Sequence, residues 1–150
     1  VMIKIKHTGG FSSTIVSIHL KCCDGDENFQ RRKAASNQLK TYIDTYLPDD
    51  EVIVLGDFND QIFGEPDSEN PFLNFIEDNE NYLFADMGLA MSDKDDWSYP
   101  SWPSHIDHIL ITNELFLHEK ETVTLLFDSC YDSYFKQVSD HRPVMIKLSK

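Results

Sequence analysis

The sequence predicts an α+β domain with one mostly antiparallel sheet and flanking helices. Two observations carry this prediction: several short segments alternate apolar with polar residues, and one long segment repeats its apolar residues at helical spacing. The predicted strands outnumber the predicted helices, and no change in composition marks a linker. Residues 1–150 are therefore expected to form one domain, and their 41% apolar content is enough for a packed core.

The chain opens with a predicted hairpin. Residues 1–6 and 14–20 both show the two-residue period of strands, and Gly9 and Gly10 between them mark a turn. Val1 stands at the start of the first strand in place of an initiator Met, which favours a chain that belongs to a longer polypeptide.

A long amphipathic helix is predicted for residues 28–47, ended by Pro48. Its apolar residues share one face, and basic residues are expected on the other faces: Arg31, Arg32, Lys33 and Lys40.

The rest of the chain reads as short strands separated by loops. A continuous apolar strand at 51–55 stops at Gly56, and an acidic, proline-containing loop runs to Asn70 before a short helix at 71–77. A second loop, 93–104, contains Trp97, Tyr99 and Trp102. Further strands are predicted at 106–111, 122–127 and 143–148, with a helical turn at 113–119.

The charge and the cysteines limit the possible functions. A formal net charge of −13 repels polyanions, so strong nonspecific binding of nucleic acid is not expected. No apolar run approaches the ~20 residues of a membrane span, and the first residues lack the core of a signal peptide. Cys22 and Cys23 are expected to be buried small residues, with a disulfide to Cys130 as the alternative in an oxidising compartment.

Polar residues gather where predicted apolar strands begin or end. Asp57 and Asn59 follow one strand, Asp107 precedes the next, and Asp140 with His141 precedes the last. Each group alone also fits a turn or a helix or strand cap, but their repeated position at strand ends favours a common site. His19, near the end of the second strand, is either a core histidine or a fourth member of that site.

Four segments in this order, HLK, LGDFND, SHIDHILIT and SDHRPV, resemble the second half of the endonuclease/exonuclease/phosphatase superfamily. Each segment alone is a weak signal, whereas the ordered set is strong and covers nearly the whole chain. The resemblance implies a four-layer α/β sandwich of which this chain holds one half, with one sheet. It also implies a phosphoester hydrolase that uses Mg²⁺ or Mn²⁺.

The resemblance also assigns roles to individual residues. Asp57 matches the carboxylate that orients or deprotonates the attacking water, and Asn59 the amide that holds a phosphate oxygen. His141 matches the imidazole that stabilises the transition state or assists the leaving group, and Asp107 the carboxylate that fixes it.

Two further residues have counterparts near the reacting phosphate. Asp140 matches a residue on or beside the metal. His19 matches a histidine of the deoxyribonuclease and sphingomyelinase branches.

One departure from the family pattern concerns the metal. The principal metal ligand of the family is a Glu from the N-terminal half, and Asp24 and Glu27 of this chain stand in no matching motif. The piece is therefore expected to need its N-terminal half or a dimer mate, because half a sandwich leaves an apolar sheet face in water. As an isolated fragment it is expected to be weak or inactive.

The aromatic loop and the predicted helix resemble those of bacterial, often exported, members of the superfamily. Inositol phosphatases carry a Trp-Cys-Asp-Arg signature where this chain has Ser-His-Ile-Asp-His, so that branch is disfavoured. Trp97 and Trp102 either contact a base or sugar of the substrate or form a plug over the end of the sheet. A nuclease and a lipid phosphodiesterase both fit the motifs, and a catalytically silent relative kept for binding is the alternative from another class.

Overall fold

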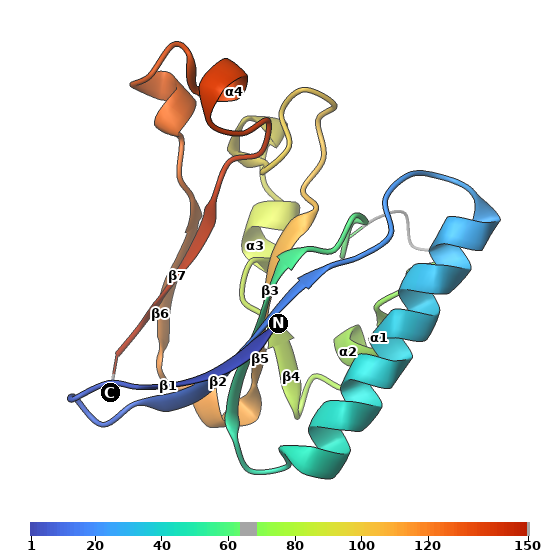
Figure 1. Ribbon diagram of the computed structural model, residues 1–150, viewed down its shortest axis with the longest axis vertical. Coiled ribbons are helices and arrows are strands. Elements are labelled where there is room, and N and C mark those ends of the chain that lie inside the picture. Colours follow the sequence, from blue (N-terminus) through green and yellow to red (C-terminus); the bar gives the residue numbers. More distant parts are fainter. Residues whose placement is uncertain (64–68, 150) are drawn as a thin grey trace.

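The computed structural model describes residues 1–63 and 69–149, and its strands form two sheets (Figure 1). A five-stranded sheet has the order β1-β2-β3-β5-β4, and β6 and β7 form a separate two-stranded ribbon. The strands are β1 Met2–Lys6, β2 Ser12–His19, β3 Glu51–Asp57, β4 Tyr82–Phe84, β5 Asp107–Thr112, β6 Glu119–Thr124 and β7 Val144–Leu148. The α-helices are α1 Asp26–Tyr46, α2 Leu73–Ile76, α3 Met87–Ala90 and α4 Tyr134–Gln137, and the 3-10 helices are η1 Lys94–Asp96, η2 Asn113–Leu115 and η3 Phe127–Ser129.

The five-stranded sheet is mixed, with one parallel pair. β1 and β2 form the predicted antiparallel hairpin, and β5 pairs antiparallel with both β3 and β4. β2 and β3 are parallel, because the long helix α1 between them returns the chain to the starting end of the sheet. The prediction of an α+β fold with a mostly antiparallel sheet is confirmed.

The two faces of the sheet bury different clusters. Val52, Val54 and Leu110 point toward α1 and belong to the larger core, which also contains a group of aromatic side chains. Ile53 and Ile111 point to the opposite face, where side chains of the ribbon pack against them. Figure 1 shows α1 on one side of the sheet and the β6–β7 ribbon on the other.

Helix α1 confirms the predicted helix, although Tyr42 and Tyr46 of the predicted apolar face are 40% and 68% exposed. Arg32 was expected on a solvent face, but it is only 5% exposed. Its guanidinium pairs with Asp60 at 2.8 Å and donates to the carbonyl oxygens of Lys21 and Cys23, so its charge is satisfied by groups from two loops. Burial of a charged side chain is tolerated when it is paired and hydrogen-bonded in this way.

The ribbon differs from the single sheet that was predicted. β6 lies three residues before its predicted position, because Thr124 pairs with Val144 and Leu125 then donates to the carbonyl of Pro143. Pro143 has no N–H to donate in return, so the ladder ends there and η3 follows.

One strand and two α-helices were not predicted: β4, α3 and α4. They contain three or four residues each, too few for a period to be visible in the sequence. The short helix predicted at 71–77 is present as α2. Residues 64–68 of the predicted acidic loop lie outside the described residues.

The prediction of buried cysteines was wrong. Cys22 is half-buried, Cys23 is exposed, and neither is linked to Cys130, because all three thiols are free. Both lie in the loop between β2 and α1, whose carbonyls face Arg32 and whose side chains face outward. Among the described residues, no helix combines the length and the apolar character needed to cross a bilayer.

Gly56 allows β2 and β3 to approach each other directly before Asp57. Its φ is +138°, and a Cβ at this position would lie 2.0 Å from the carbonyl oxygen of Ile18. Gly56→Ala should lower the free energy of unfolding by at least about 2 kcal/mol, since both the backbone conformation and the clash oppose a side chain.

Urea denaturation measures this loss, with Gly88→Ala as the matched control. Gly88 lies in α3, and a Cβ at this position would meet no atom within 4 Å, so its substitution should change stability by less than about 1 kcal/mol. Equal stability of the two variants would contradict the role assigned to Gly56.

Candidate active site

Three predicted site residues lie in one row across neighbouring strands. His19 of β2 pairs in register with Asp57 of β3, and Asp57 pairs with Asp107 of β5. Residues that are paired in register point to the same face of a sheet, which here is the face that the ribbon covers. Register alone therefore brings together side chains that are up to 88 positions apart in the chain.

His141 reaches this row from the ribbon. It stands three residues before β7, whose Val144 and Ile146 pack on the same face of the large sheet. Its Nδ1 lies 2.7 Å from Oδ2 of Asp107, which is the central contact of the site. The site thus occupies one end of the space between the two sheets.

The Asp107–His141 pair fixes the tautomer and the charge of the imidazole. A carboxylate oxygen only accepts, so Nδ1 of His141 carries a proton and Nε2 is left to act on a ligand. The hydrogen bond that His141 donates to Asp107 raises the pKa of His141, although partial burial lowers it. A histidine with a raised pKa keeps its proton near neutral pH and can donate it.

Asp57 is suited to accept a proton rather than to donate one. Burial raises the pKa of this carboxyl, and the nearby charge of Asp107 adds to the effect, while the backbone N–H of Asn59 lowers it. Asn59 N donates to Oδ1 of Asp57 at 2.8 Å. A partly buried carboxylate with a raised pKa is a better base than an exposed one.

His19 and Asn59 lie beside Asp57. The side chain of His19 is 73% exposed, with Nε2 at 3.6 Å from Oδ2 of Asp57, so it is not the core histidine that the sequence also allowed. Asn59 has a φ of +53°, a conformation that Asn tolerates better than most residues, and its side-chain Nδ2 donates to the carbonyl of Leu20.

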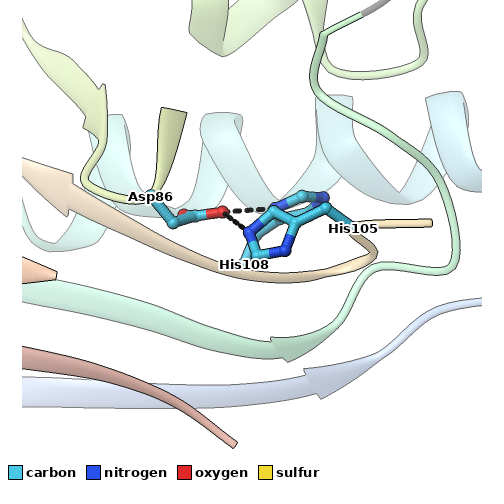
Figure 2. Close-up of side chains that lie close together, drawn as sticks. All are labelled: Asp86, His105 and His108. Atoms are coloured by element: carbon cyan, nitrogen blue, oxygen red, sulfur yellow. Dashed lines mark hydrogen bonds and ion pairs between the residues drawn. The ribbon is translucent and has the colours of Figure 1, made fainter. Parts of the chain in front are cut away.

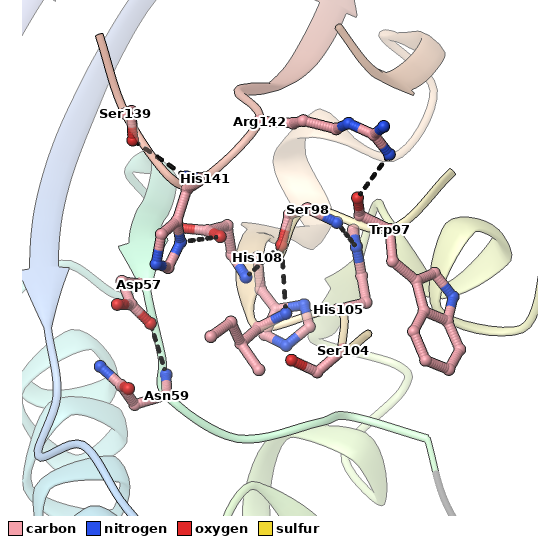
Figure 3. Close-up of polar contacts among 12 residues, drawn as sticks. Asp57, Asn59, Trp97, Ser98, Ser104, His105, His108, Ser139, His141 and Arg142 are labelled. Atoms are coloured by element: carbon pink, nitrogen blue, oxygen red, sulfur yellow. Dashed lines mark hydrogen bonds and ion pairs between the residues drawn. The ribbon is translucent and has the colours of Figure 1, made fainter. Parts of the chain in front are cut away.

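The remaining predicted residues are Asp140, Trp102 and Trp97, and they differ in how they lie relative to His141. Asp140 is exposed next to His141 and contributes to raising the pKa of that imidazole. Trp102 is 76% exposed and lines a cleft of about 430 Å³ together with Tyr99, Asn59 and His141. Trp97 points away from Asp57 and His141 in Figure 3, and its buried Nε1 has no hydrogen-bond partner among the described residues.

A second cluster, on the core face, was missed by the sequence reasoning. Asp86 follows β4, and its Oδ2 lies 2.9 Å from Nε2 of His105 and 2.6 Å from Nδ1 of His108 (Figure 2). All three side chains are at most 1% exposed. Both histidines belong to the SHIDHILIT segment, but only their buried carboxylate partner distinguishes them from surface histidines.

Hydrogen bonds define the protonation of this cluster. Nε2 of His108 donates to the carbonyl of Asp60 at 2.9 Å, and its Nδ1 faces Asp86, so both ring nitrogens carry protons. Burial alone would lower the pKa of His108, but the charge of Asp86 outweighs it and the pKa is raised. Burial would likewise raise the pKa of Asp86, but the two histidines hold it well below its usual range. The cluster therefore contains a buried ion pair, His108⁺ with Asp86⁻.

Two groups of the described residues bring three possible metal-ligand atoms within 4.8 Å of one another. The buried group, Asp86 with His105 and His108, is already saturated by hydrogen bonds. The other group, Asp57, Asp107 and His141, includes two carboxylates, and its His141 lines the cleft. Carboxylate oxygens are the ligands that Mg²⁺ and Mn²⁺ prefer, so this side of the sheet suits a hard divalent cation.

Comparison with known proteins identifies one family and several solved structures of similar fold. The model of the endonuclease-reverse transcriptase family matches residues 14–145. No curated protein sequence matches the chain significantly. Similar solved structures include an AP endonuclease from Archaeoglobus fulgidus, with a TM-score of 0.70 and 14% identity over 99% of this chain and 65% of that one.

Two eukaryotic structures are also similar. The catalytic domain of Xenopus laevis APE2 has a TM-score of 0.63 and 18% identity, covering 97% of this chain and 54% of that one. The human Nocturnin catalytic domain with a bound sulfate anion has a TM-score of 0.63 and 21% identity, covering 99% and 50%. The chain thus spans between half and two thirds of these three structures.

The buried ion pair predicts a pH-dependent loss of stability in Asp86→Asn. The raised pKa of His108 stabilises the fold fully below the ordinary histidine pKa of about 6.5, and this contribution is lost as pH rises through the folded value. The lowered pKa of Asp86 stabilises it above the ordinary aspartate pKa of about 3.9. The deficit of the variant should therefore be largest between these two values, at roughly 3–5 kcal/mol.

Urea denaturation measures the deficit at pH 5.5, where it should be largest, and at pH 9, where it should be smaller. Asp78→Asn serves as the control, because the Asp78 side chain is 28% exposed, unlike that of Asp86, and its ion pair with Lys40 involves no histidine. A deficit for Asp86→Asn that is equal at the two pH values would contradict the assigned ion pair.

Proposed function

Because the chain belongs to the endonuclease/exonuclease/phosphatase superfamily, through the family whose model matches residues 14–145, we propose that it is the C-terminal part of a divalent-metal-dependent phosphoester hydrolase. The observation that carries the proposal is the meeting of Asp57 with the Asp107–His141 pair beside an open cleft. It places a candidate base and a candidate proton donor within 4.8 Å of each other, next to a cleft that His141 lines.

Asp57 and His141 have complementary tasks in such a reaction. Asp57 orients and deprotonates the attacking water, for which its raised pKa suits it. Nε2 of His141 donates a hydrogen bond or a proton to the phosphoryl or leaving oxygen, while Asp107 holds the ring through Nδ1. Asn59 and His19 are the groups on either side of Asp57 that contact the other phosphate oxygens.

The divalent metal is proposed as Mg²⁺ or Mn²⁺. When bound, it offsets the negative charge on the phosphoryl oxygens. Asp140 is the residue of this chain that we assign to it, since its exposed carboxylate stands beside His141. The remaining ligands, including a Glu, are proposed to come from an upstream part of the polypeptide.

The substrate is proposed to present a single accessible phosphoester rather than a long polyanion. The net charge of −13 repels extended nucleic acid, and Asp24 and Asp60 line the cleft. Trp102 and Tyr99 offer flat rings at the cleft to a base or a sugar.

The first test compares this chain with the longer polypeptide. Hydrolysis of bis-p-nitrophenyl phosphate and of supercoiled plasmid is measured with Mg²⁺ or Mn²⁺ and with EDTA. His141→Gln and Asp57→Asn in the longer polypeptide should each lower turnover by about 10²–10⁴-fold, because each removes a proton-transfer group.

His7→Gln is the control for these variants, since His7 lies in the β1–β2 turn, away from the cleft. Absence of metal-dependent turnover by the longer polypeptide, on these substrates and on sphingomyelin, would support a catalytically silent relative. Wild-type turnover by either site variant would remove the role proposed for that residue.

The exposed apolar residues of β1 suggest where the upstream part packs. Ile3 and Ile5 are 52% and 43% exposed, and Ile3 pairs in register with Ile15, on the face that the ribbon covers elsewhere. We propose that the upstream part of the polypeptide covers this surface, and that a second copy covers it when the chain is alone.

Sedimentation of the isolated chain tests this packing. The chain should self-associate, and the double variant Ile3→Ser, Ile5→Ser should shift it toward the monomer, because about 25 cal/mol is lost per Å² of apolar contact removed. Tyr46→Ser is the control, since Tyr46 is 68% exposed at the end of α1, on the other side of the sheet. A monomeric wild-type chain that also fails to bind its upstream part would refute the proposal.

A further inference from the structure

Ser98 lies between the buried cluster and the active site and contacts both. It is 0% exposed, although it belongs to a loop rather than to a strand or helix. Its backbone N–H donates to Nδ1 of His105 at 3.3 Å (Figure 3). The other ring nitrogen of His105 must then carry the proton that it donates to Asp86.

The other polar atoms of Ser98 face the two segments that hold the catalytic pair. Its Oγ accepts from the backbone N–H groups of Ile106 and Asp107, both at 3.2 Å. Its carbonyl oxygen accepts from the N–H of Arg142 at 2.7 Å. One buried residue therefore binds the backbone of Asp107 and the backbone next to His141.

These contacts join β5 to the turn before β7 through the backbone, beside the direct side-chain contact of Asp107 with His141. Asp107 and His141 are 34 positions apart and come from different sheets, so nothing in the register of either sheet sets the distance between them. The side chain of Arg142 strengthens the same connection, because it pairs with Asp128 and donates to the carbonyl of Asp95.

We propose that Ser98 is a positioning residue of the active site, which holds Asp107 and His141 in hydrogen-bonding distance and is itself fixed by the buried cluster of Asp86, His105 and His108. The inference rests on the proposed function for the meaning of the pair. The geometry of the pair can nevertheless be measured without turnover. The cluster and the pair form one continuous hydrogen-bonded path, from Asp86 through His105 and Ser98 to Asp107 and His141.

The test uses the proton that His141 shares with Asp107. In protein labelled with ¹⁵N-histidine, this Nδ1–H should give a strongly deshielded proton resonance, assigned by its loss in His141→Gln. Ser98→Ala removes the Oγ that holds Asp107, so this resonance should shift upfield or be lost by exchange with water. Ser98→Thr keeps the hydroxyl oxygen and should restore the resonance.

Two internal controls separate positioning from a general loss of structure. The Nδ1–H of His108 does not depend on the Oγ of Ser98, so its resonance should persist in Ser98→Ala. Ser104→Ala removes a hydroxyl of the same loop that donates to the carbonyl of Trp102, and it should leave both resonances in place. An unchanged His141 resonance in folded Ser98→Ala would overturn the proposal.

A second measurement on the wild-type chain covers the case in which Ser98→Ala does not fold. The backbone amides of Asp107 and Arg142 should be protected from hydrogen exchange to the same degree, because both bind Ser98. Exchange of either amide at the rate of an unprotected one would refute the proposal.

Kinetics of the longer polypeptide then show what positioning contributes. Ser98→Ala should lower kcat by about tenfold and leave KM within about twofold, since a misplaced pair affects the chemical step more than binding. If the polypeptide is inactive, the proposed hydrolase function fails while the resonance test still decides the role of Ser98.

Discussion

The register between β2, β3 and β5 is the constraint on which the site depends. It places His19, Asp57 and Asp107 in one row on one face of the sheet. Because side chains alternate along a strand, a slip by one residue would turn Asp107 toward the aromatic core and His108 toward the cleft. Gly56 protects this register, since only a residue without a side chain fits beside the Ile18 carbonyl. The close packing of β2 against β3 at Gly56 therefore also determines where the side chain of Asp57 lies.

Much of the fold and half of the site could be predicted from the sequence because both follow local patterns. Period-two strands, the helix before Pro48 and polar residues at strand ends are visible in short windows, and the structure brings Asp57, Asp107 and His141 together. The missed features depend on distant partners. No residue near Arg32 in the sequence indicates that Arg32 pairs with Asp60. Asp86 likewise precedes the histidines that it binds by about twenty positions. A buried charge is recognisable only once its partner is known.

The buried cluster places a polar network in a core that is otherwise aromatic. Phe58 and Phe84 pack edge-on against the ring of His108, so the imidazolium is shielded from water on the sides where it makes no hydrogen bond. Such a network costs desolvation energy and is stable only when every donor and acceptor is satisfied. Asp86 meets this condition with three donors, which include the backbone N–H of Ile109. The network also connects β5 to the segment that follows β3, through the carbonyl of Asp60, and to the loop that contains Ser98.

The ribbon that carries His141 has a consequence for how the active site can be lost. It joins the larger sheet through half-buried side chains, among them Val144 and Ile146, whereas the larger sheet has its own core against α1. A sub-global opening that detaches the ribbon would separate His141 from Asp107 and leave the five strands paired. A population of molecules can therefore retain most of its secondary structure while the contact between Asp107 and His141 is broken. The resonance of the His141 Nδ1–H would then report a smaller unfolding free energy than circular dichroism does.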